Sequence, residues 1–106
     1  MRLYISEPYG TVIPFDIEGV SSAASALMLA NRYGVATRVG SFCTYELIRR
    51  FKGIGPAEDE RLLTAARAGN TADLPGIVRA SFSIYNRPED VTRFVEAVNE
   101  SSRHAP

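Results

Sequence analysis

The chain has 106 residues, of which 45% are hydrophobic, so a single domain over residues 1–106 with a modest core is expected. Twelve basic residues balance twelve acidic ones, which excludes the charge footprint of a nucleic-acid-binding or anionic-membrane-binding protein. The longest mostly apolar stretch, residues 23–30, is too short to span a bilayer, and the N-terminus lacks a signal-peptide layout, so a cytoplasmic location is expected.

The N-terminal segment is expected to form a hairpin. Residues 2–5 are a short β-prone run, and residues 7–10 (Glu-Pro-Tyr-Gly) are a turn signal. Residues 11–17 alternate apolar and other residues in the manner of a strand. Pro14 predicts that this strand is irregular or lies near a sheet edge, because proline cannot donate a ladder hydrogen bond.

A helix is predicted from Ser21 or Ser22 to about Tyr33. Serine is a favoured N-cap residue, and Gly34 suits the left-handed position that follows many helices. Helical spacing predicts that its buried side consists of Ala24, Leu27, Met28 and Asn31.

The middle of the chain is expected to form a strand, a loop and two helices. Residues 35–39 are the predicted strand and residues 40–43 the loop. The short helix that follows would bury Leu47, Ile48 and Phe51. After a glycine- and proline-containing break at residues 52–56, residues 57–68 predict an exposed helix with acids early and arginines late.

The last predicted strand covers residues 77–84. Its alternation places Val78, Ala80, Phe82 and Ile84 on the core face, and Arg79, Ser81 and Ser83 on the polar face.

The best helical stripe in the sequence comes last and consists of Val91, Phe94, Val95 and Val98. Asn86 and Glu89 form a pair typical of a capping box, with Pro88 in the first turn. The tail from Ser101 onward, which contains His104, is expected to fray. Strands alternating with helices, without a glycine-rich nucleotide fingerprint, predict an α/β sandwich with helices mostly on one sheet face.

Cys43 is the first candidate for chemistry. It is the only cysteine, so no internal disulfide is possible, and with one histidine the sequence offers no protein-only metal site. At a helix start and five residues after Arg38, its thiolate could be stabilised by backbone N–H groups and a guanidinium. The alternative is a small buried hydrophobic residue.

Arg79 is the second candidate, because a guanidinium on the polar face of a strand can hold a carboxylate with two hydrogen bonds. A structural ion pair is the alternative, and Arg38 is in an analogous position. Lys52 is the only lysine and lies in a glycine-containing loop, which favours a solvated surface lysine over a Schiff base.

Two segments carry a family resemblance: residues 33–43 (Tyr-Gly-Val-Ala-Thr-Arg-Val-Gly-Ser-Phe-Cys) and residues 75–86 (Pro-Gly-Ile-Val-Arg-Ala-Ser-Phe-Ser-Ile-Tyr-Asn). With the helix that follows, they resemble the C-terminal region of class V aminotransferase-like enzymes, which depend on pyridoxal phosphate (PLP). Cysteine desulfurases and selenocysteine lyases are the nearest kinds. The resemblance covers about residues 11–98 and implies an α+β small domain with a mostly antiparallel sheet, as in fold-type-I enzymes.

The resemblance also implies roles for individual residues. The family's Arg-x-Gly-x-x-Cys pattern falls on Arg38, Gly40 and Cys43, which makes Cys43 the expected sulfur acceptor. The family's Val-Arg-Ala-Ser strand falls on residues 78–81 and makes Arg79 the expected ligand of the substrate α-carboxylate, with Arg38 as a further substrate-binding residue. The His-His that commonly precedes the cysteine is replaced by Ser41-Phe42, and residues 51–74 form a longer insert, so the exact reaction stays open.

The family's PLP-binding lysine and its ring-binding residues belong to a large domain N-terminal to this region. The resemblance therefore implies PLP in the intact enzyme but no cofactor on this chain alone, which should be inactive without the large domain. Further expected partners are a small amino-acid substrate and a second copy in a homodimer. The alternatives are a stand-alone protein-interaction module and a class V transaminase or lyase that uses no cysteine nucleophile.

Overall fold

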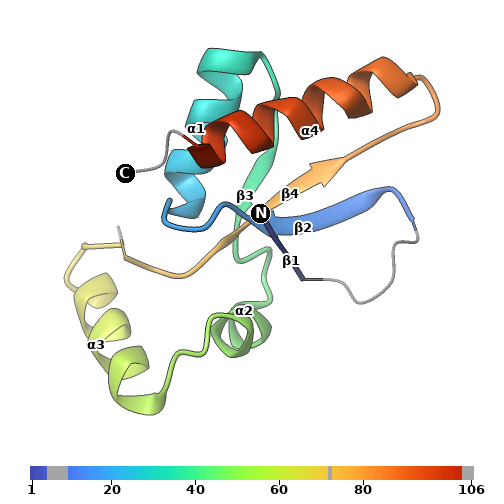
Figure 1. The fold of residues 1–106 in the computed structure, drawn as a ribbon. Coiled ribbons are helices and arrows are strands. Elements are labelled where there is room, and N and C mark those ends of the chain that lie inside the picture. Colours follow the sequence, from blue (N-terminus) through green and yellow to red (C-terminus); the bar gives the residue numbers. More distant parts are fainter. Residues whose placement is uncertain (5–9, 72, 104–106) are drawn as a thin grey trace. The chain divides into compact units, whose positions relative to one another are not determined.

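A computed structural model describes residues 1–4, 10–71 and 73–103 (Figure 1). The chain divides into two compact units. The sheet unit comprises Met1–Gly40 and Ile77–Pro106, and the helical unit comprises Ser41–Gly76. None of the helices among the described residues combines the length and apolar character needed to cross a lipid bilayer.

The described residues of the sheet unit form four strands and two helices. Its strands are β1 (Arg2–Leu3), β2 (Val12–Asp16), β3 (Arg38–Gly40) and β4 (Ile77–Ser81). They form one sheet in the order β1-β2-β4-β3, and all neighbouring strands are antiparallel. Helices α1 (Ser22–Tyr33) and α4 (Pro88–Arg103) lie side by side over the same face (Figure 1). The predicted α+β architecture is confirmed.

The core lies between the sheet and these two helices. Phe15 of β2 and Val78 of β4 are cross-strand partners, and both are fully buried. The ring of Phe94 packs edge-on against Phe15, with 5.4 Å between centroids, and against Phe82, with 5.8 Å. Such edge-to-face pairs add roughly 0.5–1.5 kcal/mol beyond area burial. Leu29, Ala80, Ala97 and Val98 complete the cluster with Ile17.

Pro14 lies in β2, an inner strand beside the short edge strand β1, which agrees with the predicted position near a sheet edge. Phe82 N donates to Thr11 O at 2.8 Å, and hydrogen-bonded pairs alternate along an antiparallel ladder. Pro14 therefore opposes Arg79 in a pair that exchanges no hydrogen bonds, and β4 does not need the N–H that proline lacks. The carbonyl of Pro14 accepts from Tyr4 N at 3.1 Å, just past the end of β1.

The limits of α1 agree with prediction, but its buried side does not. Ser21 Oγ accepts from Ala24 N at 3.2 Å, and Gly34 ends the helix at φ 66°. The buried residues are Ser25 and Leu29, whereas Leu27 is 62% exposed. A helix rich in alanine has no unique apolar side, so contact with the sheet decides which residues face inward.

The α4 stripe is likewise rotated from the predicted one. Val91 and Val95 are each 44% exposed. The buried residues are Phe94, Ala97, Val98 and Ser101, in which two small side chains alternate with larger ones. Ser101 is fully buried, so the prediction of fraying is wrong for residues 101–103, and His104 lies outside the described residues.

The chain between β4 and α4 also differs from prediction. β4 ends at Ser81, and Ile84 is fully exposed in a turn where Asn86 N donates to Ser83 O at 3.0 Å. Asp90, not Glu89, caps the helix: its Oδ2 accepts from Arg87 N at 2.8 Å. Asn86 instead holds the turn, because its Oδ1 accepts from Ser83 N at 2.7 Å.

The helical unit contains α2 (Tyr45–Phe51) and α3 (Pro56–Arg67). The break between them was predicted, and Pro56 begins α3 as expected. Tyr45 Oη donates to Asp59 Oδ1 at 2.6 Å, which ties the two helices together and raises the pKa of Tyr45. Ile48 and Leu62 are buried, but Leu47 is 47% exposed, so its predicted burial is wrong.

The predicted N-terminal hairpin is confirmed in its strands, since β1 pairs with β2. Residues 7–9 of its predicted turn lie outside the described residues. The predicted strand over residues 35–39 is present as the shorter β3, and residues 35–37 are irregular.

Candidate functional site

Two arginines oppose each other on the sheet face that points away from α1 and α4. Arg38 of β3 pairs directly with Arg79 of β4, so both side chains project from the same face. That face is opposite to the core-facing Val78 and Ala80, because successive side chains alternate along a strand. Arg38 is exposed and Arg79 is half-buried.

The pair Arg38–Arg79 is suited to an anion. Like charges directly opposite each other destabilise a sheet, and an anion between them would remove that repulsion. A planar guanidinium matches a carboxylate with two parallel hydrogen bonds. The structure therefore brings the two predicted substrate-binding arginines together on one surface.

A buried carboxylate that the sequence reasoning missed lies at the end of β2. Asp16 is 7% exposed and accepts hydrogen bonds from Tyr4 Oη at 2.5 Å and from Ser22 Oγ at 3.0 Å. Burial, and then the hydrogen bond to Asp16, raises the pKa of Tyr4 to about 12. The guanidinium of Arg2, the cross-strand partner of Asp16, lies 5.4 Å from the Tyr4 ring centroid. The signal was an acid within an otherwise apolar strand.

Cys43 lies in the helical unit, whereas Arg38 and Arg79 belong to the sheet unit. It is exposed, unlike the small buried residue of the alternative interpretation. Its backbone is left-handed at φ 61°, and Phe42 before it is left-handed at φ 53°. Thr44 N donates to Ser41 O at 2.9 Å, which closes a turn with both central residues at positive φ, as type I′ turns require.

This turn presents the Cys43 thiol immediately before α2. Glycine and asparagine are the residues that prefer such positions, so Phe42 and Cys43 are held in a strained conformation. Thr44 makes no capping bond to the helix, because its Oγ1 donates instead to Ser41 O at 2.6 Å. Backbone strain of this kind clusters at functional sites.

The described residues do not fit a PLP site. Lys52, the only lysine of the sequence, is the residue that ends α2. Where described residues of the sheet unit form the two cavities described below, no lysine lines either of them. No described group of three or more His, Cys, Asp or Glu side chains is placed to hold a metal ion.

A family match and similar proteins point to the same family. Residues 1–94 match the family described as aminotransferase class V. A probable cysteine desulfurase of Halobacterium salinarum is 30% identical over 92 residues, which are 87% of this chain and 17% of that protein. A probable cysteine desulfurase of Pseudomonas putida is 30% identical over 96 residues, which are 91% of this chain and 18% of that protein.

A third protein with the same description, from Pseudomonas aeruginosa, is 27% identical over 97 residues, which are 92% of this chain and 19% of its own length. This chain thus spans less than a fifth of the length of these relatives. Since the family match covers most of the sequence, this chain belongs to the class V aminotransferase family.

Proposed function

We propose that this chain is the C-terminal small domain of a PLP-dependent class V enzyme of the cysteine desulfurase kind, and that it binds the carboxylate of an amino-acid substrate. The observation that carries the proposal is the direct opposition of Arg38 and Arg79 on the sheet face opposite to α1 and α4. In this role Arg79 holds the α-carboxylate with two hydrogen bonds, and Arg38 adds positive charge beside it.

The rest of the catalytic machinery would lie on another part of the protein. Membership of the class V family implies PLP in the intact enzyme. The described residues do not fit that cofactor, so we assign it to a large domain, on the same or a separate chain. By itself this chain would be inactive, and the intact enzyme would be a homodimer. A cytoplasmic location stays a prediction.

Cys43 is the proposed sulfur acceptor. A thiolate on an exposed turn can attack the sulfur of a cysteine substrate. The S–S bond of a persulfide then forms as the substrate C–S bond breaks, and the electron pair of that bond stays with the substrate carbon, as in a desulfurase. Two observations support this role: the thiol is exposed, and its turn is strained.

Two other functions remain as alternatives. The replacement of the common His-His by Ser41-Phe42 favours a class V transaminase or lyase without a cysteine nucleophile. A stand-alone interaction module would instead use the surface around Phe42 and Tyr45 for a protein partner.

Carboxylate binding is tested by titrating the isotope-labelled chain with L-alanine and following the backbone amide resonances. We expect saturable shifts in β3 and β4, lost in Arg79→Gln and weakened in Arg38→Gln. Ethylamine, which has the ammonium group but no carboxylate, is the matched control ligand. Equal shifts with ethylamine, or full binding by Arg79→Gln, would overturn the proposal.

Sulfur transfer is tested in a chimera in which this chain replaces the matching segment of the Pseudomonas putida relative. We expect cysteine-dependent persulfide on Cys43, detected by mass spectrometry, and loss of sulfide release in Cys43→Ser. Turnover that survives Cys43→Ser while Arg79→Gln abolishes it would select the transaminase or lyase alternative.

A further inference from the structure

Helix α4 carries an acid and a base one turn apart that do not neutralise each other. Asp90 and Arg93 are three residues apart, a spacing at which opposite charges on a helix ordinarily pair. Among the described residues, these two side chains form no ion pair with each other. Each is held instead by the main chain of a neighbouring segment, so both charges stay available to a ligand.

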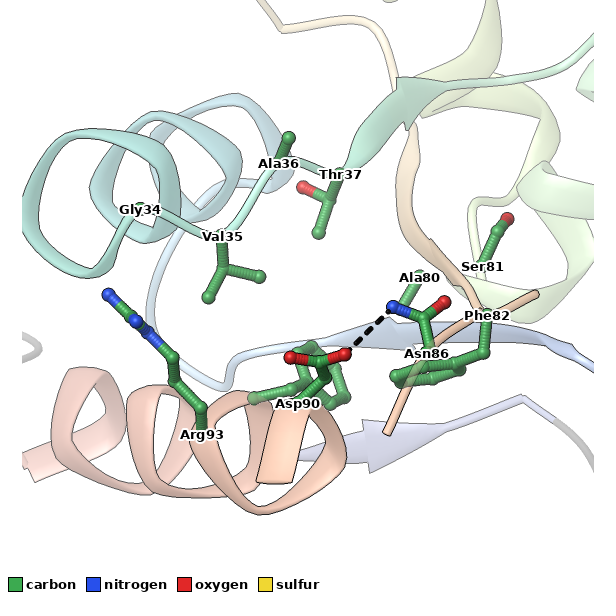
Figure 2. Close-up of a pocket in the computed structure, with 11 residues that line it drawn as sticks. Gly34, Val35, Ala36, Thr37, Ala80, Ser81, Phe82, Asn86, Asp90 and Arg93 are labelled. Atoms are coloured by element: carbon green, nitrogen blue, oxygen red, sulfur yellow. Dashed lines mark hydrogen bonds between the residues drawn. The ribbon is translucent and has the colours of Figure 1, made fainter. Parts of the chain in front are cut away.

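Asp90 is held by the turn that precedes α4. Its Oδ2 accepts from Arg87 N at 2.8 Å and from Asn86 Nδ2 at 3.2 Å. These bonds hold the pKa of Asp90 below its ordinary value, so the carboxyl group is ionised at neutral pH. Oδ1 takes no part in either bond, and Figure 2 shows it pointing away from Asn86. Asp90 therefore keeps one charged oxygen as an acceptor.

Arg93 is held by the end of α1. Its Nε and Nη2 donate to Tyr33 O at 3.3 and 3.0 Å. Nη1 takes no part in these bonds, and a guanidinium has five N–H donors in all. Because Tyr33 O is a neutral carbonyl, it does not cancel the positive charge of Arg93. Arg93 therefore keeps donors and charge for an anionic group.

Both side chains line one cavity of about 290 Å³, between the end of α1, the end of β4 and the start of α4. Val35 lies across the cavity from Asp90 and Arg93 (Figure 2). Phe82 and Phe94 add apolar surface to its lining. The volume is close to the lower limit for small-molecule sites, about 300 Å³. A ligand of this cavity is therefore a small molecule with an apolar part.

The two charges narrow the class of ligand further. A simple anion would be repelled by Asp90, and a simple cation would be repelled by Arg93. A zwitterion complements both side chains. The Cβ atoms of helix residues three apart are about 5–6 Å from each other, which suits a molecule whose ammonium and carboxylate groups lie on the same carbon.

We propose that this cavity binds the zwitterion of a small apolar α-amino acid. The ammonium group of the ligand donates to Asp90 Oδ1, and its carboxylate accepts from Arg93 Nη1. The apolar side chain packs against Val35 and Phe82. This site is separate from the Arg38–Arg79 surface and does not depend on the function proposed above.

The test is a titration of the isotope-labelled 106-residue chain with L-valine, followed by backbone amide resonances. We expect saturable shifts at Val35, Asn86 and Arg93. Two matched ligands each lack one charged group of valine: isobutylammonium has no carboxylate, and isovalerate has no ammonium. Each should bind about 10-fold more weakly, because one charged hydrogen bond is lost.

Two substitutions test the charged residues. Asp90→Asn removes the charge but keeps an oxygen that can cap α4, and it should weaken L-valine binding about 10-fold. Arg93→Gln should weaken it by a similar factor. Glu89→Gln is the control for the acid, because Glu89 is exposed and lines a separate cavity with Pro88. Arg87→Gln is the control for the base, and both controls should bind as the unaltered chain does.

Several outcomes would overturn the proposal. These are no saturable shift up to about 10 mM L-valine, equal binding of isobutylammonium or isovalerate, and unchanged binding by a folded Asp90→Asn variant. If Asp90→Asn does not fold, Arg93→Gln decides in the same way. Shifts at the cavity that disappear in Arg79→Gln would assign them to the Arg38–Arg79 surface and would also overturn the proposal.

Discussion

Arg38 and Arg79 are direct cross-strand partners, and both project from the sheet face that α1 and α4 leave open. Two positive charges in this arrangement repel each other, so the pair destabilises the folded sheet. The same pair favours the binding of an anion. The stability of the sheet unit should therefore respond to the charge at this pair.

Replacing Arg38 by glutamine should stabilise the protein by about 0.2–1 kcal/mol at low ionic strength, because the repulsion with Arg79 is removed. The gain should shrink in high salt, since exposed charges are screened. Arg2→Gln is the matched control: Arg2 is also exposed but opposes Asp16, so its loss should destabilise. Urea unfolding at two salt concentrations measures both effects, and a salt-independent gain for Arg38→Gln would contradict the explanation.

The effect of a substitution at Cys43 on stability should depend on how well the new residue tolerates the left-handed backbone at this position. Cys43→Gly should be neutral or stabilising by about 1 kcal/mol, because glycine adopts a positive φ without strain. Cys43→Val should destabilise by about 1–2 kcal/mol, since a β-branched side chain is least tolerated there. Hydrogen exchange of the α2 amides reports the local change, and equal effects of the two substitutions would argue against strain in this turn.

Removing the Ser101 hydroxyl should stabilise the sheet unit. Ser101 is fully buried, and its Oγ has no hydrogen-bond partner among the described residues. Ser101→Ala should raise the free energy of unfolding by about 1 kcal/mol, with alanine's higher helix propensity adding about 0.5 kcal/mol. Its exposed neighbour gives the control, since Ser102→Ala should show the propensity effect alone. Chemical denaturation compares them, and a loss of stability in Ser101→Ala would reveal an unrecognised partner.

Tyr4 should make the protein sensitive to high pH. Its pKa is raised from 10.0 to about 12, so the folded state holds the phenol proton more tightly than the unfolded state. The associated stability is complete below pH 10 and is lost as the pH rises toward about 12. Tyr4→Phe should flatten this part of the profile of unfolding free energy against pH. Tyr45→Phe is a second variant to compare, because the pKa of Tyr45 is also raised.

Asp90 should stabilise the first turn of α4 more than its neighbour Glu89 does. Asp90 accepts from Arg87 N and Asn86 Nδ2, and these bonds lower its pKa. Its contribution is present above the ordinary carboxyl pKa of 3.8 and is lost as the pH falls below it. We expect a lower melting temperature and less helix for Asp90→Ala than for Glu89→Ala, measured by circular dichroism at neutral pH. Equal losses of melting temperature and helix content in the two variants would instead support the capping pair of Asn86 and Glu89 predicted from the sequence.

Much of the sheet unit could be predicted from the sequence, because its signals are local. The Ser21 cap and Gly34 fix the ends of α1, and alternation identifies β2 and β4. Which side of a helix is buried depends on tertiary contact, so the inward positions of Leu29 and Ser101 could not be read from apolar spacing alone.

The arginines and the cysteine of the candidate site could be predicted from the sequence, but their arrangement in space could not. Alternation placed Arg79 on the polar face, but its pairing with Arg38 follows from the register of β3, which begins three residues later than predicted. The left-handed backbone of Phe42 and Cys43 carries no sequence signal, because neither residue is typical of such a turn.

Helices α1 and α4 cover the same face of the sheet. Successive residues of β4 therefore alternate between positions that must fit the core and positions on the other face. Val78 and Ala80 belong to the core, whereas Arg79 and Ser81 lie on the opposite face and are not part of it. Saturation mutagenesis of this strand should show a tolerance to substitution that alternates between low at core positions and high at the positions between them. Evolution can therefore alter the ligand that the strand recognises, residue by residue, while the fold stays intact.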